Sequence, residues 1–148
     1  MNVGQVCGRH VVTVLPGSEL VAAAGLMREK HIGYLVVVES EWMRRPVGVL
    51  TDRDIVVSVV AKSVDPASLT VGDVMTSRVV ATDEQGPLDA ALVQMRRNGV
   101  RRLPVLGPEG EVVGVLSIDD ALQAIMHELD DAAGSIRLER EVERATRD

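Results

Sequence analysis

Two apolar runs of the chain each lead into a hydroxyl residue that stands three positions before an aspartate. The pairs are Thr51 with Asp54 and Ser117 with Asp120, and an apolar run precedes each of them. A carboxylate can accept hydrogen bonds from both hydroxyls of a sugar diol, and a neighbouring hydroxyl can add a further contact. The two pairs are therefore candidate ribose-binding groups.

The same spacing also has a purely structural interpretation. A Thr or Ser in front of a helix caps its N-terminus, and an acidic residue three positions later completes a capping box that the helix dipole favours. Helix N-termini also suit anionic ligands, so a cap that faces a cleft could serve both purposes. The residue types alone leave both interpretations open.

Adjacent arginines, Arg101 and Arg102, precede an apolar segment, and Arg53 lies inside the first hydroxyl–aspartate pair. Two adjacent arginines before an apolar segment stand out in an acidic chain, although two solvated charges would look the same. The chain as a whole carries a net charge of −6, and its aromatic residues are Trp42 and Tyr34, with no Phe. This composition argues against nucleic-acid binding through a basic surface or stacked bases.

Nothing in the sequence resembles a catalytic or metal-binding cluster. His10, His31 and His127 lack a ligand spacing, and the single cysteine, Cys7, has no base placed beside it. Aspartates at helix starts stay ionised rather than serving as general acids. We expect a non-enzymatic protein without metal or required cofactor. The lone cysteine and the lack of a signal peptide or membrane-length apolar run predict a cytoplasmic location.

The chain repeats itself once. Shifted by 68 residues, Val3–Val6 falls on Val71–Val74, and after one loop the shift becomes 66, where Val47–Leu50 meets Val113–Leu116. Two successive units are too few for a solenoid but suit a pseudo-twofold pair. We assign residues 3–62 to the first repeat, 63–70 to a linker and 71–129 to the second repeat.

Each unit has the order β-α-β-β-α, which predicts a mixed α/β (α+β) fold. The expected strands are 11–14, 34–38 and 47–51 in the first unit, and 79–81, 103–106 and 112–117 in the second. Helix faces run from Leu20 to Met27 and from Leu88 to Met95, and second helices cover 54–62 and 120–129.

The charged segment 130–148 follows the repeats. Gly134 and Ser135 predict a break, with Ser135 capping a last helix over 136–144. Its opposite charges stand at helical spacing, so it is either a solvated helix or a partner contact made through Ile136, Leu138 and Val142.

With its repeat, its hydroxyl–aspartate ends and the stretch Val100–Val105, the chain resembles a tandem pair of CBS domains, also called a Bateman module. The segment Leu50–Ile55 is typical of small stand-alone bacterial members. The resemblance implies two units packed around a pseudo-twofold axis, with two clefts that bind AMP, ADP, ATP or S-adenosylmethionine. It also implies that segments 5–10 and 73–78 cross to the cleft of the opposite repeat.

By this resemblance, the two hydroxyl–aspartate pairs would each hold a ribose, and the starts of two central strands would flank adenine. The positions implied are Gly33, Tyr34 and Leu35 in one unit and Arg101, Arg102, Leu103 and Pro104 in the other. Arg101 and Arg102 match places where the family often has phosphate-binding basic residues, and Arg53 could reach water or phosphate. The first unit lacks the arginines and the proline, so the two clefts are expected to differ in affinity.

Two functions remain open: a regulatory sensor of adenosine compounds, and a structural interaction module whose pairs are only caps. A homodimer is expected because the second helices carry wide apolar stripes, although these could instead complete the core of a single chain. The stripes are Ile55, Val56, Val59 and Val60 in one helix, and Ala121, Leu122, Ile125 and Met126 in the other. A further protein partner is allowed, whereas nucleic acid and membrane are not expected.

Overall fold

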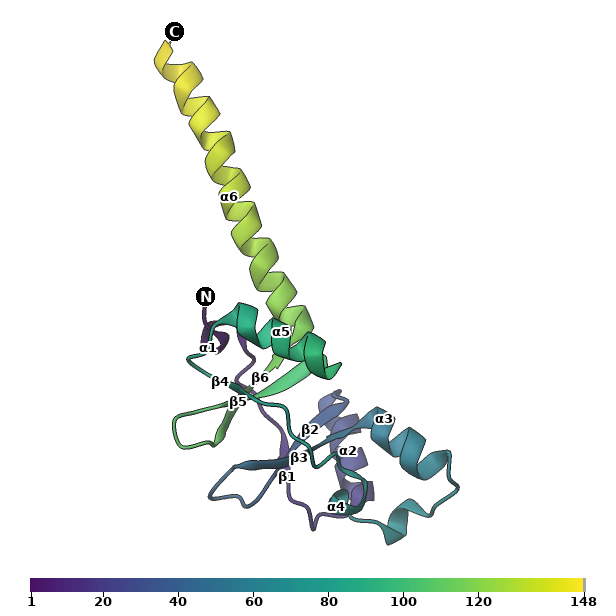
Figure 1. Ribbon diagram of the computed structural model, residues 1–148. Coiled ribbons are helices and arrows are strands. Elements are labelled where there is room, and N and C mark those ends of the chain that lie inside the picture. The colour runs from purple at the N-terminus through teal and green to yellow at the C-terminus, as the bar shows by residue number, and fades with distance from the viewer. Residues whose placement is uncertain (148) are drawn as a thin grey trace.

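The computed structural model describes residues 1–147 and contains two three-stranded sheets, one from each repeat. The strand orders are β1-β2-β3 and β4-β5-β6, and in each sheet the first pair is parallel and the second antiparallel. Figure 1 shows the two units packed together, with one long helix projecting from the second. The predicted mixed fold of two β-α-β-β-α repeats is confirmed.

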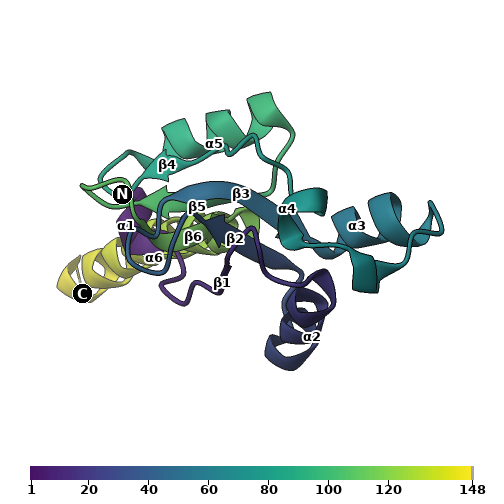
Figure 2. The same ribbon diagram turned by 90° about the horizontal axis from the view of Figure 1, so that it is seen from below.

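The elements have the following bounds. The first sheet and its helices are β1 (Thr13–Val14), α2 (Leu20–Lys30), β2 (Tyr34–Val38), β3 (Pro46–Thr51) and α3 (Asp52–Ile55), which continues as a π-helical turn over Val56–Val60. The second set is β4 (Thr82–Asp83), α5 (Leu88–Asn98), β5 (Arg102–Leu106), β6 (Val112–Ser117) and α6 (Ile118–Arg147). Short helices α1 (Val3–Val6) and α4 (Val71–Val74) begin the two repeats, and a 3-10 turn covers Pro66–Ser68. In Figure 2, α5 and α2 lie on opposite sides of the strands.

The outer parallel strands are shorter than predicted, and one lies elsewhere. The first spans only Thr13–Val14, and the strand expected at 79–81 is formed instead by Thr82–Asp83. The carbonyl of Ala81 accepts a hydrogen bond from the Gln94 side chain at 2.7 Å, so this residue is satisfied outside a sheet. Apolar residues show where a segment is buried. The segment forms a strand only where its backbone runs beside the central strand of its sheet.

The helix break predicted at Gly134 and Ser135 is wrong, because α6 runs without interruption from Ile118 to Arg147. The Ser135 hydroxyl donates to the carbonyl of Asp131 at 3.0 Å, so it bonds within the helix rather than capping a new one. One glycine inside a helix costs only about 1 kcal/mol relative to alanine, which a long helix can absorb. The expected end at Leu129 is therefore also wrong.

The first residues of each repeat pack against the other unit. The Val3 amide donates to Gly86 at 2.9 Å, and Gly8 pairs with Val115 of β6, so the N-terminal segment completes the second unit. In the same way Thr76 pairs with Val49 of β3 and joins the first unit. This is the crossing that the family resemblance implied.

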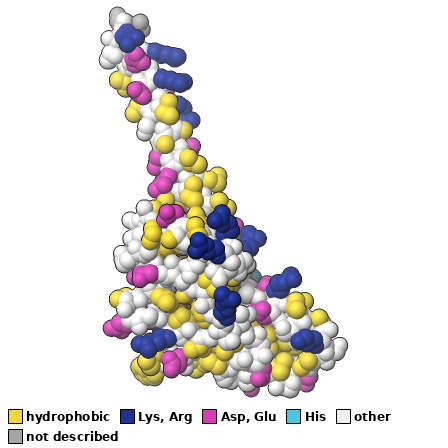
Figure 3. Space-filling model, viewed as in Figure 1, with side chains coloured by type: hydrophobic (Ala, Val, Ile, Leu, Met, Phe, Trp, Pro, Cys, Tyr) yellow, Lys and Arg dark blue, Asp and Glu magenta, His cyan; other side chains and the backbone are white. Residues whose placement is uncertain are grey.

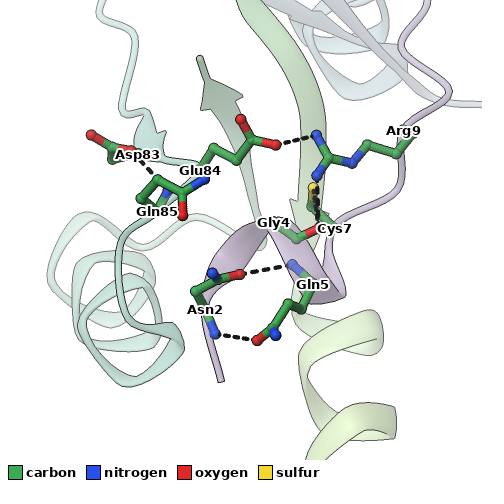
Figure 4. Close-up of polar contacts among 8 residues, drawn as sticks. All are labelled: Asn2, Gly4, Gln5, Cys7, Arg9, Asp83, Glu84 and Gln85. Carbon is green, nitrogen blue, oxygen red and sulfur yellow. Dashed lines mark hydrogen bonds and ion pairs between the residues drawn. The ribbon is translucent and has the colours of Figure 1, made fainter. Parts of the chain in front are cut away.

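Polar contacts fasten the N-terminal segment to the second unit. In Figure 4, Arg9 reaches Glu84, with Nη1 and Oε1 2.6 Å apart, and its Nη2 donates to the carbonyl of Gly4 at 2.9 Å. Asn2 and Gln5 form a capping box that starts α1. These contacts thus fix the N-terminal segment close to the point where its apolar residues enter the core of the second unit.

Three apolar clusters hold the molecule together. One lies inside each unit, and the third joins the units through Val36, Val38 and Val112, with Tyr34 and Val115 packed against them. Strand β2 is consequently buried on both faces, as its nearly unbroken apolar sequence predicts.

A glycine in β6 makes the crossing testable. A Cβ at Gly114 would lie 2.7 Å from the Cys7 Sγ and 2.9 Å from the Gly8 carbonyl oxygen. Gly114→Ala should therefore push the N-terminal segment away and lower the free energy of unfolding by about 1–3 kcal/mol. Denaturant unfolding measures this loss.

The control is Gly25→Ala in α2, where a Cβ meets nothing within 4 Å. That change should raise stability by roughly 0.4–1 kcal/mol, since alanine favours the helix. Equal effects of the two substitutions would contradict the close approach at Gly114.

Candidate functional site

A cleft of about 400 Å³, here the first cleft, lies between the two units. Its walls come from the start of β2, the β3–α3 junction, the segment that follows α4, and the turn between α5 and β5. The lining residues are Gly33, Tyr34, Val49, Thr51, Asp52, Arg53, Asp54, Thr76, Arg78, Val80, Gly99, Val100, Arg101 and Arg102. The volume falls within the range of small-molecule sites.

Thr51 and Asp54 stand at the wall of this cleft and also cap α3. The Asp54 amide donates to the Thr51 Oγ1 at 3.1 Å, and the Thr51 amide donates to the Asp54 Oδ2 at 2.9 Å. Both side chains are half-buried. The cap engages one carboxylate oxygen of Asp54, and a carboxylate can accept further bonds through its second oxygen.

A similar hydroxyl–aspartate box occurs outside both clefts described here. The Thr70 amide and hydroxyl donate to the Asp73 Oδ2 at 2.8 and 3.0 Å, and neither residue lines either cleft. These hydrogen bonds, first that of the amide and then that of the hydroxyl, lower the pKa of the Asp73 carboxyl. The spacing therefore forms a cap wherever it occurs, and only position can give one pair a further role.

The first cleft is locally basic in an acidic chain. Four arginines line it (Arg53, Arg78, Arg101 and Arg102), against two aspartates (Asp52 and Asp54). Arg101 approaches Asp119 only loosely, at 3.8 Å with both side chains exposed, so it remains free to meet an anionic ligand.

Tyr34 and Arg102 separate the first cleft from a second one and line both. They are equivalent positions of the two repeats, and the Arg102 guanidinium carbon lies 5.9 Å from the centre of the Tyr34 ring. Burial raises the pKa of the Tyr34 phenol above its usual range, and the Arg102 charge offsets part of that effect. The Tyr34 phenol thus stays uncharged and forms part of the wall of both clefts.

The second cleft, of about 440 Å³, is the pseudo-twofold counterpart of the first but differs in chemistry. It is lined by His10, Val12, Lys30, His31, Ile32, Gly33, Tyr34, Val36, Arg102 and Val115. Ser117 and Asp120 do not line it, and the Ser117 hydroxyl donates to the Asp120 Oδ2 at 2.6 Å. The two hydroxyl–aspartate pairs, alike in sequence, are therefore placed differently.

Three further residues expected at the site belong to the core. Leu35 and Leu103 are fully buried in β2 and β5, and Pro104 is buried beside Leu103. Gly33 does line both clefts, and a Cβ there would lie 2.7 Å from the Asp52 Cγ, so the exposed Asp52 side chain would have to move.

Arg78 in the first cleft and His10 in the second were not singled out as individual site residues. The sequence does indicate both residues, because they lie in the crossing segments. The 68-residue shift also maps His10 onto Arg78 and Val12 onto Val80. Within residues 1–147, no cluster of three His, Cys, Asp or Glu side chains could hold a metal ion. In the same part of the chain, every helix is too short or too polar to cross a membrane.

Comparison with known proteins agrees with this architecture. The model of the CBS domain family matches the chain twice, at residues 3–61 and 71–127. A curated relative, uncharacterized protein MK0525 of Methanopyrus kandleri, is 33% identical over 123 residues. The match covers 83% of this chain but 62% of that relative, so the chain spans less than two thirds of its length.

Solved structures show the same fold. A putative signal-transduction protein with CBS domains from Burkholderia ambifaria superposes with a TM-score of 0.76 at 28% identity, covering 86% of this chain and 95% of that one. The CBS domain pair of protein MJ0100, in complex with 5′-methylthioadenosine and S-adenosyl-L-methionine, superposes with a TM-score of 0.74 at 22% identity, over 86% and 98% of the two chains. The two matched repeats, the crossed segments and the paired clefts thus have one explanation: the chain belongs to the CBS domain family and forms a tandem CBS pair.

Proposed function

We propose that this CBS pair is a non-enzymatic regulatory module that binds an adenosine compound (AMP, ADP, ATP or S-adenosylmethionine) in its first cleft. The observation that carries the proposal is the position of Asp54 and Thr51 at the wall of a cleft that also holds four arginines. Such a site offers an acceptor for a ribose diol and cations for phosphates.

Each part of an adenine nucleotide has a matching wall. Aliphatic side chains of Val49, Val80 and Val100 can flank a base, which in this aromatic-poor cleft replaces stacking on rings. The ligands bound by the MJ0100 pair, both adenosyl compounds, support this ligand class.

The second cleft should bind differently. Its described lining contains Lys30, Arg102 and two histidines but no carboxylate, so it lacks the acceptor for a ribose diol. We expect weaker binding of neutral adenosine there than in the first cleft.

A ligand in the first cleft would touch both units at once. Binding would favour the arrangement of the units that best fits the ligand, and a partner protein could sense that shift. The cytoplasm, which is rich in nucleotides and keeps a thiol such as Cys7 reduced, is the proposed setting.

The second candidate is a structural interaction module without a small-molecule ligand. It is favoured by the Thr70–Asp73 box, which shows that the motif can be a cap alone. Ligand titration separates the two candidates, since the structural module would give no binding heat with any adenosyl compound.

The matched caps provide the sharpest test of the first cleft. Asp54→Ala should weaken AMP binding by about 1.5–3 kcal/mol, the scale of hydrogen bonds to a charged group. Asp73→Ala removes an equivalent cap outside both clefts and should leave affinity unchanged. Isothermal titration calorimetry measures both variants.

Both substitutions should cost similar stability, about 0.5–2 kcal/mol for a lost cap. Unfolding curves therefore serve as the internal control. Unchanged AMP affinity in Asp54→Ala would mean that Asp54 caps α3 and does not contact the ligand.

The arginines predict an order among ligands. Arg78→Ala should lower affinity for ATP and AMP much more than for adenosine, because only phosphorylated ligands lose a charge-assisted bond. Arg28→Ala, on an exposed part of α2, is the control and should change none of the three. The same loss for adenosine as for ATP would indicate a packing defect.

We also propose a homodimer, although fewer residues of the apolar stripes are available for it than the sequence suggested. Val59 and Ala121 are buried within the chain, so these parts of the stripes complete the core. Val56, Val60, Leu122 and Met126 remain 51–68% exposed. A twofold dimer would cover them by one operation.

Val60→Glu should dissociate this dimer, because it places a charge in an apolar contact. Val21→Glu on α2, a comparably exposed valine outside the stripes, is the control. Sedimentation equilibrium at low micromolar concentration measures the mass. A parent protein that sediments as one chain would overturn the dimer.

A further inference from the structure

Helix α6 carries an apolar stripe that continues beyond the body of the molecule, where hydrophobic side chains follow the projecting helix (Figure 3). We define the α6 stripe as Leu122, Met126, Leu129, Ala133 and Ile136. At about 100° per residue these five positions fall within an arc of about 80°. Their alternating spacing of four and three residues is that of helices that pair along a seam.

The large members of this stripe are exposed in the single chain. Leu129 is 65% and Ile136 is 54% accessible, although both lie on a well-formed helix. Leu138 and Val142 do not extend the stripe, since Leu138 lies about 180° round the helix from Leu129. The contact that the sequence suggested through Ile136, Leu138 and Val142 together is therefore split between two faces.

The α6 stripe of one copy fits the α6 stripe of a second copy that runs in the opposite direction. When two copies of α6 run antiparallel with the two Leu129 side chains face to face, Leu122 of each lies opposite Ile136 of the other. Met126 then lies within about one residue of Ala133 along the pair, so that a long side chain meets a small one. A twofold axis through Leu129 generates every contact twice, as a symmetric interface requires.

The charges beyond the stripe favour the antiparallel direction. Arg140 and Arg144 continue the same face of α6 after Ile136. An antiparallel pair brings Arg140 next to Asp119 of the second copy, a side chain that is 72% exposed and only loosely paired within its own chain. A parallel pair would instead place each arginine against its own copy, and like charges repel.

We propose that α6 pairs antiparallel with α6 of a second copy, about a twofold axis at Leu129. This pairing rests on the proposed homodimer and specifies its direction and register. It brings Arg140 of the second copy near Asp119, which lies beside the stripe in the first turn of α6.

Single cysteines on the stripe test the register directly. Leu129→Cys should form a disulfide-linked dimer under mild oxidation, because position 129 meets itself. Ile136→Cys alone should not, since its copies would lie about 21 Å apart along the pair. A mixture of Ile136→Cys and Leu122→Cys chains should give the mixed dimer. The parent chain, whose Cys7 is buried, should remain uncrosslinked.

A matched pair of charged variants tests the face. Leu129→Glu should weaken dimerisation at least tenfold in sedimentation experiments. Leu138→Glu, on the same helix with 61% exposure but on the opposite side, should leave it unchanged. Self-crosslinking of Ile136→Cys as efficient as that of Leu129→Cys would overturn the antiparallel pairing, and so would equal effects of the two glutamates.

Failure of this pairing is distinguishable from failure of the broader proposals. A dimer that is disrupted by Val60→Glu but not by Leu129→Glu would retain the homodimer and reject the α6 contact. Adenosine-compound binding is measured separately by calorimetry on the parent chain, and its outcome does not depend on either variant.

Discussion

The crossing of the two N-terminal segments is the constraint on which the rest of the structure depends. Val3 fills the core of the second unit and Val71 that of the first, and both are fully buried. Burying a valine contributes roughly 1.5–3 kcal/mol, so a unit deprived of its crossing segment would lose both a core residue and a strand-edge partner. The core of each unit is therefore incomplete without the first residues of the other repeat.

The crossing also explains why the clefts lie between the units. After leaving the core, each segment passes the opposite unit and supplies a wall, Arg78 to the first cleft and His10 to the second. A ligand held there would contact elements of both repeats. Tyr34 and Arg102, shared by the clefts, provide a physical route by which occupancy of one could affect the other.

The pseudo-twofold symmetry holds for the backbone but not for the chemistry. Equivalent strands pair in equivalent registers, with Leu35 opposite Leu50 and Leu103 opposite Leu116. Only the first cleft includes an aspartate of a hydroxyl–aspartate pair, and only the second unit extends into the long projecting α6. One repeat thus supplies the better ribose site, whereas the other supplies the surface best suited to assembly.

The sequence by itself determined the two repeats, the order of their elements and the capping boxes, because identities in register and local spacing are properties of the chain alone. It could not determine which box faces a cleft: Asp54, Asp73 and Asp120 each accept a hydrogen bond from the amide of the hydroxyl residue three positions earlier, and only the packing of the units places Asp54 at a cleft wall. Local signals also made one outer strand too long, misplaced the other and predicted a break at Gly134 that α6 does not have. Strand pairing requires a neighbour that is distant in sequence, and a helix tolerates a glycine when the turns on both sides continue it.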